Sequence, residues 1–217
     1  MSLRLGDSAP NFTAQTTQGE IDFYEYLGDS WGILFSHPAD YTPVCTTELG
    51  RTALLKDEFK KRNVKVLAVS VDPLEKHHGW VNDINETQNC EVDFPIIADE
   101  DKKVSDLYGM IHPNASETST VRSLFVIGLD KKIKLMITYP ASTGRNFNEV
   151  LRVIDSLQLT SKHNLATPAD WKNGEDVIVV TAVSTEDAQK KYEDLRIVKP
   201  YLRYTAVPQE ESLKNSW

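Results

Sequence analysis

A single thiol stands at the start of a predicted helix. Cys45 lies in the stretch SHPADYTPVCTTELG (36–50) and is one of only two cysteines in 217 residues. Thr42 is a favourable N-cap, because its hydroxyl can accept a hydrogen bond from an N–H two or three residues on, and Pro43 suits the first helical position. Cys45 then falls in the first turn, close to free amide groups and to the positive end of the helix dipole. That environment favours the thiolate, which is the nucleophilic form of cysteine.

Other roles for this thiol have less support. Most free cysteines are small buried hydrophobes, but Cys45 follows a polar loop after a buried strand, where α/β sheets place their binding sites. A CxxC exchange motif is absent, because the partner positions hold Thr42 and Glu48. His37 offers a base for a Cys–His hydrolase, although nothing else in the sequence supports one.

The remaining histidines do not form a metal motif. Their spacing from the two cysteines matches no zinc site (His77, His78, His112 and His163). We expect the adjacent pair His77 and His78 to lie on a solvated helix face. The sequence therefore predicts neither a metal nor another cofactor.

Alternating strand and helix patterns must position the thiol. Apolar, β-branched runs predict strands at 31–36, 64–71, 94–98 and 123–128. The alternating run 132–139 follows a turn-like segment, which indicates an antiparallel hairpin. Helices are predicted at 43–61, 73–87 and 146–160, the last with an apolar stripe of Phe147, Val150, Leu151, Ile154 and Leu157. This order predicts an α/β fold with a mixed sheet flanked by helices.

The pattern changes after about residue 164. A loop-rich segment is followed by a short strand at 176–181, a charged helix at 186–194 and the run YLRYT at 201–205. We expect a main domain over 1–163 and a small C-terminal α+β domain over 164–217. The tail is too short to hold a core of its own comfortably, so we expect it to pack on the main domain or on a partner subunit.

Composition and charge exclude several classes of protein. A net charge of -8 and a pI near 5.2 provide no basic surface for nucleic acid or an anionic membrane. No apolar run approaches the roughly 18 residues of a spanning helix, and the N-terminus lacks the apolar core of a signal peptide. Two cysteines do not make a disulfide framework, so we expect a reducing, cytoplasmic location.

The same stretch carries a resemblance to a known family. P38-A-D-Y-T-P-V-C45 resembles the PxxxTxxC signature of the peroxiredoxins, and the string from Phe35 to Gly50 is similar to the one-cysteine class. Similar strings recur along nearly the whole chain, among them GDSAPNF, KRNVKVLAVSVD, YPASTGRNFNEVLRVIDSLQLT and ATPADWKNGEDV. The resemblance implies a thioredoxin-like fold with an additional C-terminal domain. Because members of the family associate through sheet edges, we also expect a homodimer.

The resemblance also implies roles for individual residues. Cys45 would attack the terminal oxygen of a hydroperoxide and become a sulfenic acid. Thr42 would hydrogen-bond the peroxide, Arg122 would stabilise the thiolate and the transition state, and Pro38 would shield the thiolate from water. His37, Glu48 and Arg145 are the supporting candidates, with Glu48 expected to orient an arginine.

The second cysteine is expected to take no part in the reaction. Residues 164–217 hold no cysteine, and Cys90 lies between a predicted helix and strand, where this class often has a cysteine without a resolving role. The sulfenate would then be resolved by an external thiol such as glutathione or thioredoxin. The expected protein is a thiol-dependent peroxidase that acts in antioxidant defence and redox homeostasis.

Two other functions remain open at this point. L27-G-D-S-W-G32 resembles the GxSxG-like stretch linked to phospholipase A2 activity in some members of the class, with Ser30 as nucleophile and Asp130 as acid. The histidine base of those members is missing, and Tyr24 stands nearest its position. A chaperone or redox-signalling role, in which sulfenate formation is the switch, is the non-enzymatic alternative.

Overall fold

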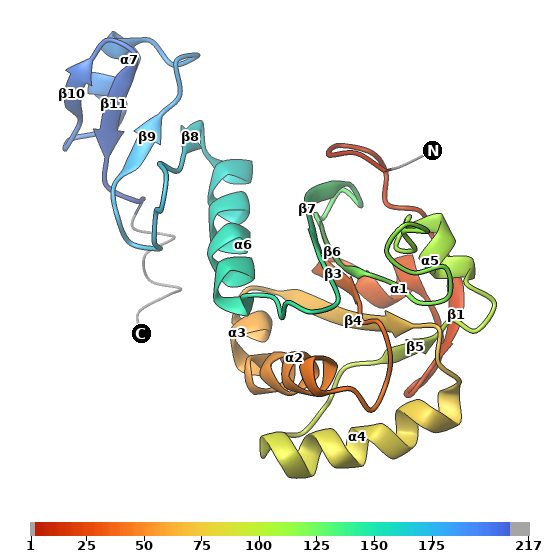
Figure 1. Cartoon of the computed structure of the whole chain (residues 1–217). Helices are drawn as coiled ribbons and strands as arrows, with labels where there is room; N and C mark the ends of the chain where they lie inside the picture. Colours follow the sequence, from red (N-terminus) through yellow and green to blue (C-terminus); the bar gives the residue numbers. More distant parts are fainter. Residues whose placement is uncertain (1–2, 209–217) are drawn as a thin grey trace. The chain divides into compact units, whose positions relative to one another are not determined.

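The computed structural model describes residues 3–208 (Figure 1), and within it the chain forms two compact units that divide between Phe147 and Asn148. This division comes before the last long helix, whereas the sequence pattern placed the domain boundary between residues 163 and 164. Each unit has its own sheet. Among the described residues, no helix is both long enough and apolar enough to cross a membrane.

The first unit is built on a seven-stranded mixed sheet, in the order β2-β1-β5-β4-β3-β6-β7. Its central strands β3, β4 and β5 are parallel. β6 runs antiparallel to β3, and β7 runs antiparallel to β6. The predicted strands and the hairpin are confirmed, with small shifts at their ends. The strands are β1 (Thr13–Thr16), β2 (Gly19–Asp22), β3 (Trp31–Ser36), β4 (Val64–Ser70), β5 (Ile96–Ala98), β6 (Arg122–Ile127) and β7 (Ile133–Tyr139).

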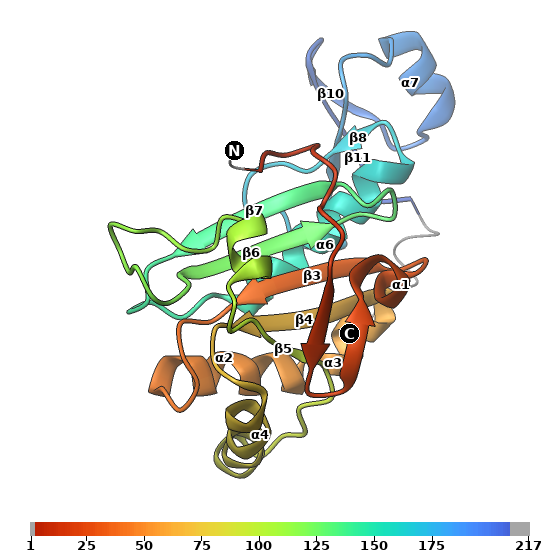
Figure 2. The ribbon, with the colours of Figure 1, turned by 90° about the vertical axis from the view of Figure 1, so that its right-hand side faces the viewer.

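Helices cover this sheet. Figure 2 shows α2 (Pro43–Leu54), α3 (Lys56–Lys61) and α4 (Leu74–Gln88) gathered on one side of the strands. Side chains of α1 (Phe23–Leu27) and α5 (Lys103–Leu107) pack with strand residues in a hydrophobic core. The prediction of one helix over 43–61 was wrong, because the backbone turns at Leu55 (φ -94°, ψ 9°) and starts a second helix.

A compact aromatic and aliphatic core fixes the strands. Phe12 and Phe23 stack with ring centroids 4.8 Å apart, and Tyr108 meets both rings edge-on. Burial of each large apolar side chain contributes about 1.5–3 kcal/mol, so this core holds the sheet rigid beneath the loops at its end. The strand residues in the core are Leu34, Leu67, Val69, Ile97, Phe125, Ile127 and Ile133.

The second unit contains a four-stranded antiparallel sheet in the order β10-β11-β9-β8. The expectation that this part lacks a core of its own was wrong. Trp171 is 1% exposed and packs with other buried apolar residues, so its large side chain forms much of the core of this unit. The elements are α6 (Phe147–Lys162), which begins at the division, β8 (Leu165–Ala166), β9 (Val177–Val179), α7 (Thr185–Lys191), β10 (Arg196–Lys199) and β11 (Leu202–Thr205).

Candidate active site

Cys45 occupies the third position of α2, as the sequence predicts. Pro43 is the first helical residue, Thr42 is the N-cap with extended backbone angles, and Cys45 is fully buried. The first hydrogen bond of the helix runs from the Thr46 N–H to the Thr42 carbonyl at 3.0 Å, so the N–H groups of Val44 and Cys45 precede the hydrogen-bonded turn.

The prediction that the Thr42 hydroxyl accepts a cap hydrogen bond from the first turn of α2 was wrong. Its hydroxyl donates to the Ala39 carbonyl at 2.8 Å and accepts from no backbone N–H of α2. The donor proton of Thr42 is therefore committed to the loop before the helix. The lone pairs of its oxygen remain as acceptors.

Arg122 reaches the thiol from a distant part of the chain. β6 runs antiparallel to β3, so the first residue of β6 lies at the edge of the sheet where β3 ends and the loop to α2 begins. The Arg122 Nη1 donates to Cys45 Sγ at 3.3 Å, while Nε and Nη2 both donate to the Ala141 carbonyl, at 3.0 and 2.7 Å. The guanidinium is thus held on one side by a backbone oxygen and faces the sulfur on the other.

Glu48 and Arg145 complete a buried charge cluster with Arg122. Glu48 lies one helical turn after Cys45, on the same face of α2. Its Oε2 accepts from Arg122 Nη1 and from Arg145 Nη2, both at 2.7 Å, and its Oε1 accepts from the backbone N–H and the Nε of Arg145, both at 2.8 Å. Burial alone would raise the pKa of Glu48, but the hydrogen bonds and charges of the two arginines outweigh it and lower that pKa.

The charges of this cluster do not sum to zero. Two guanidinium groups and one carboxylate leave one positive charge among side chains that are at most 7% exposed. Buried charges require partners, and a Cys45 thiolate would balance the cluster. The guanidinium of Arg145 also lies 5.0 Å from the ring centre of Phe35, so the sheet supports it from below.

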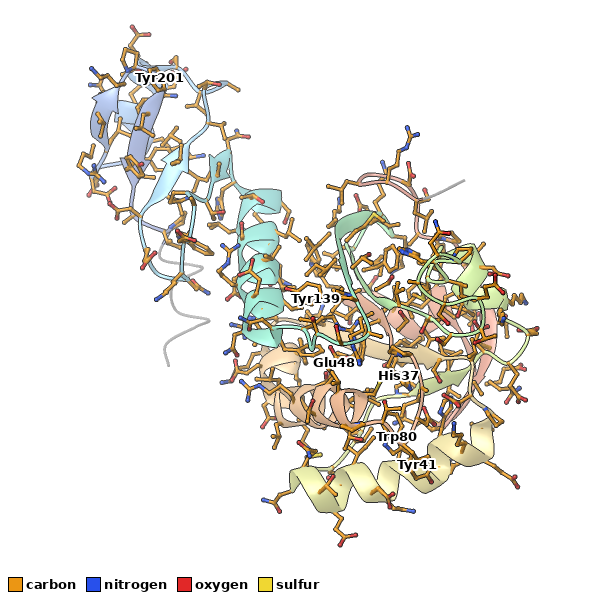
Figure 3. All side chains as sticks on the ribbon, in the orientation of Figure 1. His37, Tyr41, Glu48, Trp80, Tyr139 and Tyr201 are labelled. Atoms are coloured by element: carbon orange, nitrogen blue, oxygen red, sulfur yellow. The ribbon has the colours of Figure 1, made fainter. Side chains whose placement is uncertain are left out.

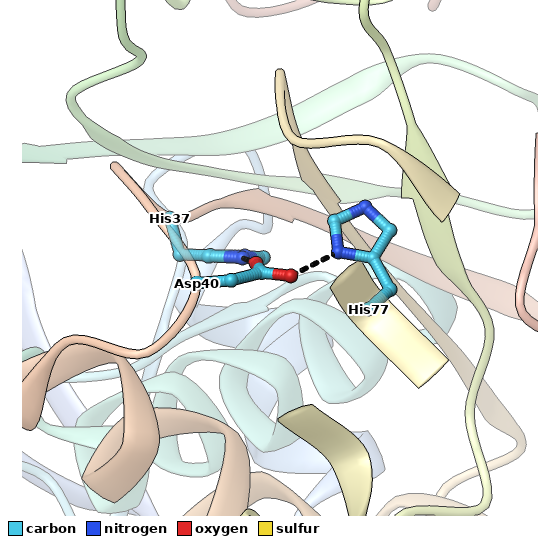
Figure 4. Close-up of side chains that lie close together, drawn as sticks. All are labelled: His37, Asp40 and His77. Carbon is cyan, nitrogen blue, oxygen red and sulfur yellow. Dashed lines mark hydrogen bonds and ion pairs between the residues drawn. The ribbon is translucent and has the colours of Figure 1, made fainter. Parts of the chain in front are cut away.

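A second buried cluster anchors the loop that precedes α2, and it contains two residues that the sequence analysis missed. The carboxylate of Asp40 bridges His37 Nε2, at 2.7 Å, and His77 Nδ1, at 2.5 Å (Figure 4). His77 was expected on a solvated helix face but has no exposed surface, whereas His78 is exposed. Adjacent residues of a helix point about 100° apart, so the helical period could have shown that the two histidines face different surroundings.

These three side chains are residue types that bind metals, with ligand atoms within 4.8 Å of one another. The separations at Asp40 are hydrogen-bond lengths, and the carboxylate already bridges both imidazoles. A zinc ion holds its ligands at about 2.0–2.2 Å, so these atoms would have to move apart to surround one. We therefore assign the cluster as a hydrogen-bond network.

The other predicted loop residue, Pro38, is half-buried between His37 and the turn that carries Asp40. Tyr41 follows with a left-handed backbone (φ +56°) and is 50% exposed, with its ring centre 6.4 Å from that of Trp80. Figure 3 shows Tyr41 and Trp80 beside α4, and His37 and Glu48 closer to the strands.

Cys90 lies apart from these groups. It follows α4, is half-buried, and its thiol approaches the Ile84 carbonyl and the Asn85 side chain at 3.8 and 3.9 Å. Burial raises the pKa of the Cys90 thiol, which disfavours its nucleophilic form at neutral pH.

The residues considered for a hydrolase do not form a catalytic site. The Ser30 hydroxyl donates to the Asn63 side chain at 2.8 Å, and the Tyr24 hydroxyl donates to the Ala9 carbonyl at 2.5 Å. Asp130 is paired with Lys134 at 2.7 Å. In this arrangement the proton of Ser30 is directed at an amide oxygen rather than at a base.

Comparisons with known proteins identify the family. The model of the AhpC/TSA family matches residues 5–136, and that of the C-terminal domain of 1-Cys peroxiredoxin matches residues 156–195. The 1-Cys peroxiredoxin of Dictyostelium discoideum is 56% identical over 207 residues, which are 95% of this chain and 86% of the relative. The chain therefore belongs to the AhpC/TSA family and, within it, to the one-cysteine peroxiredoxins.

Solved structures agree in fold. A crystal structure of the C45S mutant of peroxiredoxin 6 from Arenicola marina has a TM-score of 0.92 and 46% identity, over 96% of this chain and 100% of that one. A yeast mitochondrial 1-Cys peroxiredoxin, described with a thiol resolving mechanism via glutathione/thioredoxin systems, has a TM-score of 0.89 and 51% identity, over 94% and 99%. The predicted thioredoxin-like fold is confirmed, and the chain is a thiol-dependent peroxidase.

Proposed function

We propose that Cys45 is the residue that attacks hydrogen peroxide and organic or lipid hydroperoxides. The observation that carries this proposal is the Arg122 guanidinium, which donates to Cys45 Sγ at 3.3 Å within a cluster that a thiolate would neutralise. In the reaction, a bond forms between Sγ and the terminal peroxide oxygen while the O–O bond breaks. The products are the sulfenic acid and an alkoxide or hydroxide, which takes up a proton to become an alcohol or water.

The neighbouring residues would assist this step in different ways. Arg122 places positive charge where negative charge develops on the peroxide oxygens, and the Ala141 carbonyl and Glu48 keep it in place before substrate arrives. The Thr42 oxygen, whose proton is committed to Ala39, would accept the hydrogen bond of a hydroperoxide O–H. Pro38 would limit the access of water to the sulfur.

The sulfenate would then be resolved by a thiol from outside the chain. The external thiolate attacks the sulfur and forms an S–S bond while the S–O bond breaks, and the hydroxide that leaves takes up a proton to become water. A second external thiol then reduces this mixed disulfide, which releases Cys45 as a thiol and forms the disulfide of the reductant. Glutathione and thioredoxin are the proposed reductants, on the basis of the yeast relative. The contacts of the Cys90 thiol, with Ile84 and Asn85 rather than with the Arg122 cluster, and its raised pKa support a one-cysteine cycle.

Assembly and location are further parts of the proposal. β7 is an outer strand of the seven-stranded sheet and carries the partly exposed Met136, which supports a homodimer formed through sheet edges. A monomeric mass in solution at micromolar concentration would contradict this assembly. Both described cysteines are free thiols, in keeping with a cytoplasmic, reducing location.

The chemical proposal is tested by comparing Cys45→Ser with Cys90→Ser. Peroxide consumption should vanish in the first variant and persist in the second, with mass spectrometry showing one added oxygen on Cys45 after one equivalent of peroxide. Recovery of the thiol is then compared with glutathione and with thioredoxin as reductants. Equal loss of activity in both variants would contradict the one-cysteine cycle.

A further inference from the structure

The buried network of His37, Asp40 and His77 has a proton arrangement that its hydrogen bonds define. His77 Nδ1 faces the Asp40 carboxylate, and its Nε2 faces the Ile97 carbonyl at 3.2 Å. An ionised carboxylate and a carbonyl are acceptors only, so both ring nitrogens of His77 carry protons. The ring therefore forms a buried ion pair with Asp40.

His37 holds a different arrangement. Its Nε2 donates to Asp40, and its Nδ1 is buried with no hydrogen-bond partner among residues 3–208. A proton on Nδ1 would create a buried, unpaired N–H and a second cation beside one carboxylate, which is costly. His37 is therefore the neutral Nε2–H tautomer.

The surrounding charges fit this assignment. Burial alone would raise the pKa of Asp40, but hydrogen bonds from both histidines hold it at about 2, and burial lowers the pKa of His37. The other charged groups at the network are Asp72, which accepts from the Asp40 N–H at 2.9 Å, and Lys76, which pairs with Asp72. Two anions and two cations then balance, with His37 neutral.

The network ties the loop before α2 to three other elements. His77 belongs to α4 and contacts the carbonyl of Ile97 in β5. Asp72 lies two residues after Ser70, the last residue of β4, whose hydroxyl donates to its carboxylate. The loop is thus held at both the side chain and the backbone of Asp40, three residues before Pro43 begins the helix of Cys45.

We propose that Asp40 and His77 are positioning residues of the peroxidase reaction, whose hydrogen bonds hold His37 and the loop 37–42 so that Thr42 and the first turn of α2 are correctly placed. This inference rests on the assignment of Cys45 as the attacking residue. Neither Asp40 nor His77 has to touch the peroxide. Their effect passes through the backbone that carries Pro38 and Thr42.

Substitutions at Asp40 separate hydrogen bonding from charge. In Asp40→Asn, the amide oxygen can accept from His37 Nε2, and the amide N–H can donate to Nδ1 of a singly protonated His77, so every bond of the network survives without an ion pair. Asp40→Ala removes the hydrogen bonds of the carboxylate to both histidines, and His77→Phe removes the two bonds of the His77 ring. His78→Phe is the matched control, because His78 neighbours His77 on α4 but is exposed.

The rate constant for peroxide reduction is measured by stopped flow for all four variants. A displacement of about 1 Å can cost roughly 100-fold in rate, so we expect a loss of at least about tenfold in Asp40→Ala and His77→Phe, and rescue to within about threefold in Asp40→Asn. His78→Phe should match the wild type. Wild-type rates in Asp40→Ala and His77→Phe would overturn the proposal, as would equal losses in Asp40→Ala and Asp40→Asn.

Nitrogen NMR of the imidazole rings supplies a readout that a general loss of packing would not move. At neutral pH, His77 should show two protonated nitrogens in the wild type and one in Asp40→Asn, and His37 should show one in both. A single proton on wild-type His77 would overturn the assignment, and this readout stands even if His77→Phe fails to fold. Turnover retained in Cys45→Ser would instead contradict the assignment of Cys45 as the attacking residue. That result would not change the number of protonated nitrogens on His37 and His77, so the two failures can be told apart.

Discussion

Replacing Glu48 with glutamine removes one charge from the buried cluster at Cys45 and keeps the shape of the side chain. Each carboxylate oxygen accepts two hydrogen bonds, all four of them from Arg122 and Arg145. The amide nitrogen of a glutamine would face two donors in either orientation, because neither a guanidinium nor a backbone N–H can accept. Among residues 3–208, the variant leaves the two buried cations with no anionic partner other than a Cys45 thiolate.

Removal of one partner from a buried ion pair costs about 3–5 kcal/mol, and we expect the free energy of unfolding of Glu48→Gln to fall by that amount at neutral pH. Urea unfolding followed by circular dichroism measures it. The control is Asp130→Asn, which affects a pair with Lys134 near the surface and should cost at most about 1 kcal/mol.

The pH dependence of this difference gives a second check. Because the pKa of Glu48 is lowered in the folded state, its stabilising contribution is complete above the ordinary pKa of about 4.3 and is lost as the pH falls through the lower, folded value. The gap between wild type and Glu48→Gln should therefore stay constant near neutrality and narrow below about pH 4. A gap under about 1 kcal/mol at neutral pH, or one that does not narrow in acid, would refute the reasoning.

Two further predictions concern the guanidinium at the site and the core of the C-terminal unit. Arg122→Lys cannot contact the Ala141 carbonyl, Glu48 and Cys45 together, so the rate constant for peroxide reduction should fall roughly 100-fold. The control is Arg196→Lys at an exposed position, which should leave that rate constant unchanged. Both are measured by stopped flow, and an undiminished rate constant in Arg122→Lys would contradict the role of the Arg122 guanidinium. Trp171→Ala removes a fully buried indole and should lower the stability of the C-terminal unit by about 3–5 kcal/mol. Amide hydrogen exchange measures this as a loss of protection in β9, and unchanged protection would count against an independent core.

Local patterns in the sequence were enough to predict much of the frame. Apolar runs located the central strands, and the Thr-Pro pair located the start of α2, because both signals depend on neighbouring residues only. Cys45 is in the first helical turn for the same reason. The break at Leu55 and the hydrogen bond from Thr42 to Ala39 were not predictable, since each depends on how the surrounding chain packs.

The site around Cys45 was decided by the tertiary structure. Arg122 and Arg145 come from distant segments, and the resemblance named them without showing that one carboxylate, Glu48, holds both. His77 was misplaced, and its link to Asp40 was missed, because the two residues lie 37 positions apart and meet only when α4 packs beside the loop. The sequence alone therefore determined which residue can act as the nucleophile. Folding decided which charges surround it, because a buried charge is stable only where the fold brings its partners within hydrogen-bond distance.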